Sequence, residues 1–242
     1  MFYLKEELMI KYYTPIAEIY NFLGKFINKD MKVLELGPGV LPFPYATHFC
    51  GWLDSEREKL SNYKVVDFSK DRFPYEDKEF DFVYARHVLE DLYNPFHCMD
   101  EMSRIGKSGF IECPSPIAEV CKDVENWSEP TDDKLKLRGY QHHYYFVWND
   151  GQLNFLHKFP TVEYMKINEE DYLLELLKDK YYWNTYYLWK DNIKYKHHEH
   201  PKDYFAPCNK EYAELIVKGI NSSINFTGNF KKKMLKIESE RS

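Results

Sequence analysis

A glycine-bearing turn after a short apolar segment is the first place in this chain where the residue types favour chemistry. Val33-Leu34-Glu35-Leu36 runs directly into Gly37-Pro38-Gly39. The apolar run is typical of a buried strand, and bare backbone at the two glycines would let a ligand approach the carboxyl edge of a parallel sheet. A dinucleotide fingerprint needs a third glycine at position 42, where this chain has Pro42. The turn therefore favours an adenosine cofactor that bears an amino acid, and a plain structural turn stays the alternative.

Three histidines and one glutamate are candidates for moving a proton near neutral pH. His142 and His143 lie in a segment that would reach over the carboxyl edge of the sheet, and we favour one of them as a general base or substrate ligand. The alternative for both is a hydrogen-bonded structural histidine in an aromatic hairpin. His87 ends a predicted strand and would either face the substrate or cap the following helix. Glu112 is a further candidate.

The segment His197-His198-Glu199-His200 has the residue types of a metal site. Adjacent residues of an extended segment point to opposite faces, which leaves His198 and His200 as a pair without evident partner ligands. A zinc site needs more ligands than two. The five cysteines include no Cys-x-x-Cys pair. We therefore expect no metal site and no disulfide framework, and we expect a reducing, cytoplasmic location.

The elements that must position these residues alternate in type along the first half of the chain. Apolar segments at 31–36, 63–67, 80–85 and 110–113 predict strands, and a helical pattern occupies 95–105. A further helical region is expected within 3–28, with a helix start at Thr14-Pro15. Strands that alternate with helices predict an α/β fold with a doubly wound, mostly parallel sheet and helices on both faces.

Two blocks of this half resemble the class I S-adenosylmethionine-dependent methyltransferases. The stretch Glu35-Leu36-Gly37-Pro38-Gly39 is similar to the first motif of that family. The block at 80–92 is similar to the fourth-strand motif of the large subgroup with a His-Val-Leu-Glu-His signature, and reads His87-Val88-Leu89-Glu90-Asp91 here. Asp67-Phe68 resembles the acidic residue after the third strand, which contacts the adenine amino group in the family.

The resemblance covers roughly residues 30–115 and implies a Rossmann-like sheet with S-adenosylmethionine as cofactor and S-adenosylhomocysteine as product. The cofactor-binding residues it implies are Glu35, Gly37, Pro38, Gly39, Asp67, Phe68 and Arg86. One position departs from the family. The end of the second strand, near residues 50–52, lacks the acidic residue that holds the ribose hydroxyls, and Asp54 or Glu56 is expected to replace it.

The second half of the chain has a different, aromatic-rich pattern. Asn149-Asp150-Gly151-Gln152 between 144–148 and 153–156 predicts a hairpin, and 182–189 with 192–197 predicts another. A helix is expected near 168–179, and a fraying polar tail from Lys231 onward. We expect one domain over residues 1–242, composed of N-terminal helices (1–30), a cofactor-binding half (31–115), a cap with acceptor-side hairpins (116–205) and a C-terminal segment (206–242).

The composition limits the class of partner. Aromatic residues make up 18% of the 242 residues, which excludes a disordered chain, and many of them fall in 140–205. We interpret these rings as the wall of an acceptor site, with codon bias as the alternative. A net charge of −6 gives no reason to expect a nucleic acid, and no signal peptide or ~18-residue apolar stretch predicts a membrane partner.

Together these features predict methyl transfer to a small polar acceptor, most specifically O-methylation of a sugar or nucleotide-sugar. Aromatic faces stack on sugar rings, while polar side chains bond their hydroxyls. A degenerate binding module that has lost turnover is the alternative outside the enzyme class. A protein or another small molecule stays the alternative acceptor within it. The oligomeric state is left open, a homodimer included.

Overall fold

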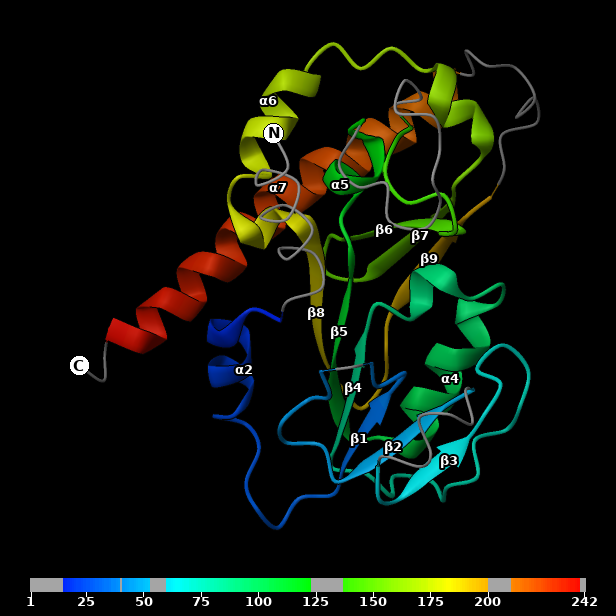
Figure 1. Cartoon of the computed structure of the whole chain (residues 1–242), viewed down its shortest axis with the longest axis vertical. Coiled ribbons are helices and arrows are strands. Elements are labelled where there is room, and N and C mark those ends of the chain that lie inside the picture. Colours follow the sequence, from blue (N-terminus) through cyan, green and yellow to red (C-terminus); the bar gives the residue numbers. More distant parts are fainter. Residues whose placement is uncertain (1–14, 40, 53–59, 123–136, 200–209, 240–242) are drawn as a thin grey trace. The chain divides into compact units, whose positions relative to one another are not determined.

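The computed structural model describes residues 15–39, 41–52, 60–122, 137–199 and 210–239. The chain divides into two compact units, whose elements are labelled in Figure 1. Unit 2 consists of Ile16–Cys113 and Tyr186–Tyr195, and unit 1 consists of Met1–Pro15, Pro114–Thr185 and Lys196–Ser242. The boundary after Cys113 lies beside the boundary expected at residue 115. The segment 186–195, which we expected in the cap, belongs to unit 2 instead.

Unit 2 is built around a six-stranded sheet with the order β3-β2-β1-β4-β5-β8. Its strands are β1 (Val33–Leu36), β2 (His48–Gly51), β3 (Tyr63–Val65), β4 (Phe82–Arg86), β5 (Ser108–Pro114) and β8 (Asn184–Lys190). Four strand pairs are parallel: β1 with β2, β1 with β4, β2 with β3, and β4 with β5. The expected α/β fold with a mostly parallel sheet is confirmed.

The strand order gives unit 2 a switch point between β1 and β4. The chain proceeds outward from β1 through β2 to β3, and then returns to the other side of β1 with β4 and β5. Ligands of open α/β sheets bind at the carboxyl ends of the strands at such a point. The segments that follow β1 and β4 are therefore where a binding site is expected.

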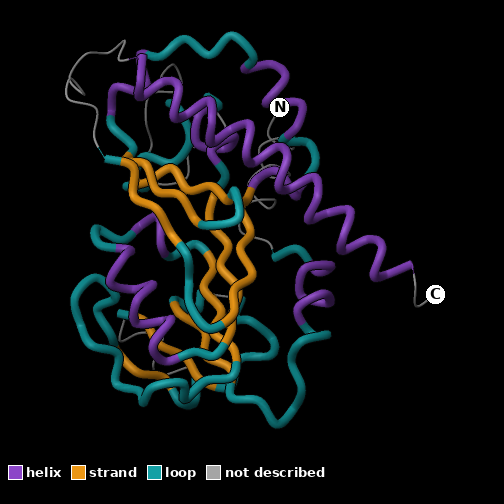
Figure 2. Tube along the Cα trace, turned by 180° about the vertical axis from the view of Figure 1, so that it is seen from behind, coloured by secondary structure: helices purple, strands orange, loops and turns teal. Residues whose placement is uncertain are grey.

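Helices flank this sheet on both sides. They are α2 (Ala17–Leu23) and α4 (Pro95–Ile105), and Figures 1 and 2 show them on opposite sides of the strands of unit 2. α4 begins at Pro95 because the Asn94 side chain accepts a hydrogen bond from the backbone N of His97 at 3.3 Å, and proline needs no partner in a first turn. Its apolar face is buried through Cys98, Met99, Met102 and Ile105.

The link from β1 to β2 contains no helix in its described part. Residues 37–39 and 41–47 form turns and irregular backbone. A helix that starts beside a glycine turn directs backbone N–H groups and a positive dipole end at a bound phosphate. The described residues of this link contain no such helix start.

Unit 1 combines a three-stranded sheet with helices. The sheet has the order β6-β7-β9, with β6 (Tyr145–Asn149) and β7 (Leu153–His157) antiparallel and β9 (Tyr195–His198) beside β7. The predicted hairpin at 144–156 is thereby confirmed, and its turn contains Gly151 at φ 106°. The helical elements are α5 (Pro116–Val120), α6 (Glu170–Leu176), α7 (Lys210–Ser239) and the 3₁₀ turns η2 (Pro160–Tyr164) and η3 (Lys180–Trp183).

Two predictions for the second half are wrong. The segments at 182–189 and 192–197 do not pair as a hairpin, because β8 joins the sheet of unit 2 and β9 joins the sheet of unit 1. The expected fraying tail is part of α7, which continues to Ser239. Lys231 lies inside this helix, and its Nζ pairs with Asp179 at 2.5 Å. A long helix face that packs on the core thus overrides the polar composition of the tail.

The aromatic excess of 140–205 largely builds the core of unit 1. Rings that we interpreted as an acceptor wall are fully or almost fully buried, among them Tyr140, Phe146, Trp148, Phe155 and Trp183. All of these rings except Phe155 belong to one core cluster with residues of α5 and α7. No helix within the described ranges combines the length and the apolar character that crossing a bilayer requires.

Candidate functional site

The turn after β1 requires glycine at its first position. Gly37 adopts φ +63°, a conformation that side chains other than glycine rarely take, and its N–H donates to the carbonyl of Cys50 at 2.8 Å. A Cβ at this position would lie 2.8 Å from Cγ2 of Val88 and 4.0 Å from the ring of Phe68. The turn thus lies directly against the segment that follows β4.

The backbone at Gly39 is open, since a Cβ there would meet no atom within 4 Å. Glu35, in contrast, is buried within β1, and its Oε2 accepts a hydrogen bond from the backbone N of Phe43 at 2.8 Å. Glu35 therefore fixes the loop after the turn. The open approach to the backbone is at Gly39.

Asp67 and Phe68 follow β3. Lys70 pairs with the Asp67 carboxylate at 2.9 Å, and the backbone N of Ser69 donates to it at 3.0 Å. These two contacts, that with Lys70 first, lower the pKa of Asp67 and keep it ionised. Phe68 is buried against Phe73, with ring centroids 5.6 Å apart. Its ring lies beside the Gly37 turn, 4.0 Å from where a Cβ of residue 37 would be.

Arg86 ends β4 and faces Glu112 on β5. The two residues are in register, and Arg86 Nε lies 3.6 Å from Glu112 Oε1. Tyr20 on α2 lies near the same charges. Burial is the main cause that raises the pKa of Tyr20 to about 12, with Glu112 and Glu35 adding to the rise and Tyr84 and Arg86 opposing it. The end of β4 is thus a crowded, charged edge.

His87, one residue beyond β4, has an unusual backbone. Its φ is +54°, although it is not glycine, and its N–H donates to the carbonyl of Glu112 at 2.8 Å. Its Nδ1 lies 3.6 Å from Oε1 of Glu90, which is 1% exposed on the turn η1 (Leu89–Asp91). The structure therefore brings His87 to the switch point of the sheet beside a buried carboxylate.

In unit 1, Glu119 on α5 is completely buried between two basic groups. Its Oε1 lies 2.5 Å from Nδ1 of His143, and its Oε2 pairs with Nζ of Lys158. Lys158 also donates to the carbonyl of Tyr140 at 2.8 Å. Burial acts to raise the pKa of Glu119, but Lys158 and His143 outweigh it and lower the value to about 2. The cluster ties α5 to the segment before β6 and to the end of β7.

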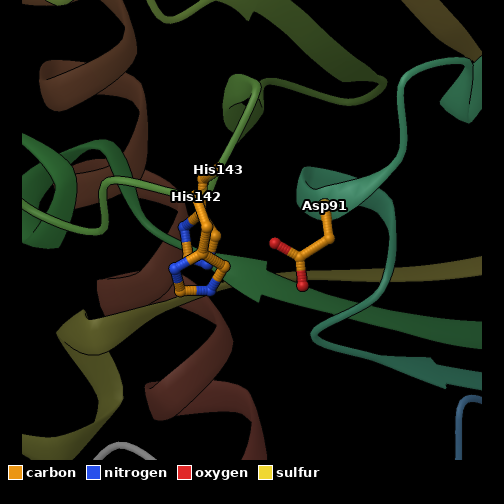
Figure 3. Close-up of side chains that lie close together, drawn as sticks. All are labelled: Asp91, His142 and His143. Carbon is orange, nitrogen blue, oxygen red and sulfur yellow. The ribbon is translucent and has the colours of Figure 1, made fainter. Parts of the chain in front are cut away.

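His142 and His143 lie side by side, with ring centroids 4.4 Å apart (Figure 3). Asp91, the third residue drawn there, belongs to η1 of unit 2. His143 is buried with Glu119, which matches the structural alternative stated for it. His142 is exposed, although burial of part of its ring and the neighbouring His143 lower its pKa to about 4. A catalytic role for either histidine stays a prediction.

Several other candidates have a definite place or lie outside the described residues. Asp54 and Glu56 fall in 53–59, and His200 also falls outside the described ranges. β2 ends in Cys50 and Gly51, so no acidic side chain occupies the end of that strand. His198 forms a hydrogen bond between its Nε2 and Oδ1 of Asn154 at 2.9 Å, and its ring stacks on Trp148.

Sequence reasoning did not single out Glu90, Glu119 or Lys158. Glu90 was visible inside the block at 80–92, three residues after His87, and this spacing within a turn was the available signal. Glu119 and Lys158 are 39 residues apart, and no local pattern connects them. Only the fold brings them together.

With this geometry in place, comparison with known proteins identifies the central segment. Residues 47–111 match the family model described as a methyltransferase domain. The resemblance to methyltransferases is thereby confirmed over this segment, which contains Asp67, Phe68, Arg86 and His87. The first motif at 35–39 lies outside the matched residues. A search of curated protein sequences finds no match to this chain.

Solved structures show a partial likeness. The YcgJ protein of Bacillus subtilis is 15% identical, with a TM-score of 0.32 over 41% of this chain and 52% of that one. A methyltransferase of Thermotoga maritima, described as a possible histamine N-methyltransferase, is 14% identical, with a TM-score of 0.36 over 46% and 56%. The trans-methyltransferase CalH in complex with SAH is 19% identical, with a TM-score of 0.30 over 40% and 36%. The chain thus spans about a third to a little over half of these structures.

Proposed function

We propose that this chain is an S-adenosylmethionine-dependent methyltransferase that acts on a small polar acceptor. The match of residues 47–111 to a methyltransferase domain carries the proposal. The local geometry supports it, because Gly37, Phe68 and Val88 lie together at the switch point of the sheet. The open backbone at Gly39 leaves room for a ligand at the carboxyl end of β1.

The residues of unit 2 fit such a cofactor. The turn Gly37-Pro38-Gly39 would take the amino-acid part of S-adenosylmethionine, and the ionised Asp67 would accept from the adenine amino group. Arg86 would add a cation near the carboxylate of the cofactor. The cofactor supplies an activated methyl group, and S-adenosylhomocysteine is the product. The chain must then orient the acceptor, exclude water and accept a proton.

For the acceptor we propose O-methylation of a sugar or nucleotide-sugar. Although most rings in the second half are buried, Tyr164 and Tyr172 are exposed in unit 1, and their ring faces would stack on a sugar ring. A net charge of −6 argues against a nucleic acid as substrate. The absence of Cys-x-x-Cys pairs favours a cytoplasmic setting.

A methyltransferase-like binding module without turnover is the second candidate. Two observations favour it. β2 ends without an acidic side chain, and the described part of the β1–β2 link forms no helix. Both reduce the number of groups that could hold the cofactor.

The experiment that tests the proposal is calorimetric binding of S-adenosylhomocysteine by the wild-type chain and two glycine variants. We expect the wild type to bind. We expect Gly37→Ala to bind at least about tenfold more weakly, a loss of about 1.4 kcal/mol, because alanine would have to adopt φ +63° and press on Val88. Gly39→Ala should fold normally, since its Cβ meets open space, and weaker binding by this variant would show that the ligand approaches the backbone there.

Failure of the wild type to bind S-adenosylhomocysteine would contradict the cofactor assignment. Transfer of a labelled methyl group to a panel of hexoses, UDP-hexoses and GDP-mannose separates the two candidates. Turnover of any member excludes the binding module. Binding of the cofactor with no turnover across acceptors of every chemical class would favour that module instead.

A further inference from the structure

The backbone of His87 adopts a left-handed conformation directly after β4. A left-handed φ of +54° is uncommon in residues other than glycine, although histidine adopts it more often than most residues, as asparagine and aspartate do. Such residues cost on the order of 1–3 kcal/mol and cluster at sites where the conformation is used. The strained residue follows β4 directly, at the switch point of the sheet.

The left-handed turn places the imidazole beside Glu90. Nδ1 of His87 lies 3.6 Å from Oε1 of Glu90, and the side chains of the two residues are 13% and 1% exposed. A carboxylate taken out of water is costly unless a basic group or hydrogen bonds compensate it, so its retention at this position calls for a partner such as His87. Glu90 also faces the buried thiol of Cys113 on β5 and contributes to the raised pKa of that thiol.

The pair adjoins the proposed cofactor turn within the same unit. Val88, the residue between His87 and η1, is the side chain against which Gly37 packs. The other charged groups at this edge of unit 2 are Arg86 on β4, Asp91 on η1 and Glu112 on β5. Arg86 pairs with Glu112, and the carboxylate of Glu90 lies at ion-pair distance from His87.

We propose that His87 is the general base of methyl transfer and that Glu90 is its positioning residue. The inference rests on the proposed function. The acceptor oxygen forms a bond to the methyl carbon while the carbon–sulfur bond of the sulfonium breaks, sulfur keeps the electron pair, and the hydroxyl proton passes to the imidazole. The charge of Glu90, whose Oε1 lies 3.6 Å from Nδ1, favours a proton on that nitrogen, so that Nε2 is the nitrogen that accepts the proton, and it stabilises the resulting imidazolium.

The test that needs no acceptor is nitrogen-15 NMR of the histidine rings in the full chain. We expect the neutral ring of His87, assigned through the signal lost in His87→Gln, to carry its proton on Nδ1. In Glu90→Gln the ring should titrate at lower pH, because removing a carboxylate beside an imidazole lowers the pKa of that imidazole. A proton on Nε2, or a titration that Glu90→Gln leaves unchanged, would overturn the inference.

Turnover on the sugar panel gives the second readout. His87→Gln should bind S-adenosylhomocysteine as the wild type does and lose about 10²–10⁴-fold in kcat. Glu90→Gln should lose about 10–100-fold, as partners that orient metal-binding histidines do, and its pH–rate profile should move to lower pH. Full turnover by His87→Gln would overturn the proposal.

Two matched controls lie at the opposite edge of the same sheet. His48 begins β2, and Glu79 precedes β4. His48→Gln and Glu79→Gln should keep both cofactor binding and turnover. If the wild type fails to bind S-adenosylhomocysteine in calorimetry, the proposed function itself is wrong. If the wild type binds and turns over but His87→Gln turns over equally well, only the role of His87 is wrong.

Discussion

Each unit of this protein contains a histidine beside a buried glutamate, and the two pairs differ in what else holds the carboxylate. In unit 1, Glu119 contacts His143 at 2.5 Å and also pairs with Lys158. In unit 2, Glu90 lies 3.6 Å from His87, on a short turn at the end of a strand. The first histidine has ordinary backbone, and the second has φ +54°.

We interpret this difference as one between a pair that stabilises the fold and the pair that we propose for proton transfer. A buried carboxylate that forms an ion pair with a lysine is held in its ionised form, because removing either charge leaves the other buried without a partner. A buried carboxylate beside an imidazole, in contrast, can stabilise that ring when it gains a proton and tolerate the neutral ring when the proton leaves. Backbone strain also accompanies only the second pair, and strain is retained where the surrounding structure needs the conformation.

The sharpest test of this comparison is the stability of the two glutamine variants. We expect Glu119→Gln to lower the free energy of unfolding by about 3–5 kcal/mol, because the Lys158 charge remains buried without its partner. Glu90→Gln should change it by about 1 kcal/mol or less, since a neutral His87 remains compatible with glutamine. Urea unfolding at pH 7 measures both.

Lys158→Met in the Glu119→Gln background is the control for this prediction. Removing the stranded charge should recover a large part of the loss, whereas a loss caused by packing alone would stay. Equal destabilisation by Glu119→Gln and Glu90→Gln would contradict the distinction between the two pairs.

The segment that carries His143 gives a second test, with a somewhat smaller expected effect. Gly139 has φ +53°, and a Cβ there would lie 2.5 Å from Cα of Glu119. We expect Gly139→Ala to cost about 2–4 kcal/mol through backbone strain and overpacking. Gly228→Ala in α7 is the control and should be neutral or stabilising, because alanine favours helices and its nearest contact is a tyrosine hydroxyl at 3.4 Å. A small loss in Gly139→Ala would show that the cluster is loosely packed.

How much of this fold followed from sequence depends on whether the signal was local. α4 occupies the predicted residues 95–105 and is capped by Asn94, and β6 and β7 flank the predicted Asn149-Asp150-Gly151 turn, because caps and tight turns are specified by neighbouring residues. The pairing of β8 and β9 was mispredicted, since two adjacent strands around Lys190-Asp191 look like a hairpin wherever they go in space. Which sheet a strand joins depends on its packing against residues that are distant in the sequence.

The candidate site shows the same division. Gly37 and the block around His87 were visible because their chemistry depends on residues close in sequence. Glu119 was not, because its partners lie 24 and 39 residues later. The aromatic excess was misread for a related reason. Composition cannot distinguish a ring that lines a site from one that fills a core, and Trp148 and Trp183 prove to be core.

The smallest expected effect concerns pH and compares His142 with Glu119 inside unit 1. The pKa of His142 is lowered from 6.5 to about 4, so the folded state favours the neutral ring. Its contribution to stability is complete above pH 6.5 and is lost as the pH falls through 4. The pKa of Glu119 is lowered from 4.5 to about 2, so its contribution is complete above pH 4.5 and is lost as the pH falls through 2.

The two windows can be separated by thermal unfolding between pH 7 and pH 2. His142→Asn should reduce the decline between pH 6.5 and 4, to which His48 and His198 also contribute because their pKa values are lowered too, and should leave the decline below pH 4.5. Glu119→Gln should reduce only the lower decline, to which Asp67 and Asp81 also contribute. The upper window should be shallow, since the His142 ring is exposed and solvent screens its neighbours. A steep upper window that persists in His142→Asn would have to arise from another histidine. Asking whether His87→Gln removes it would then show whether the pair in unit 2 also depends on proton binding for its stability.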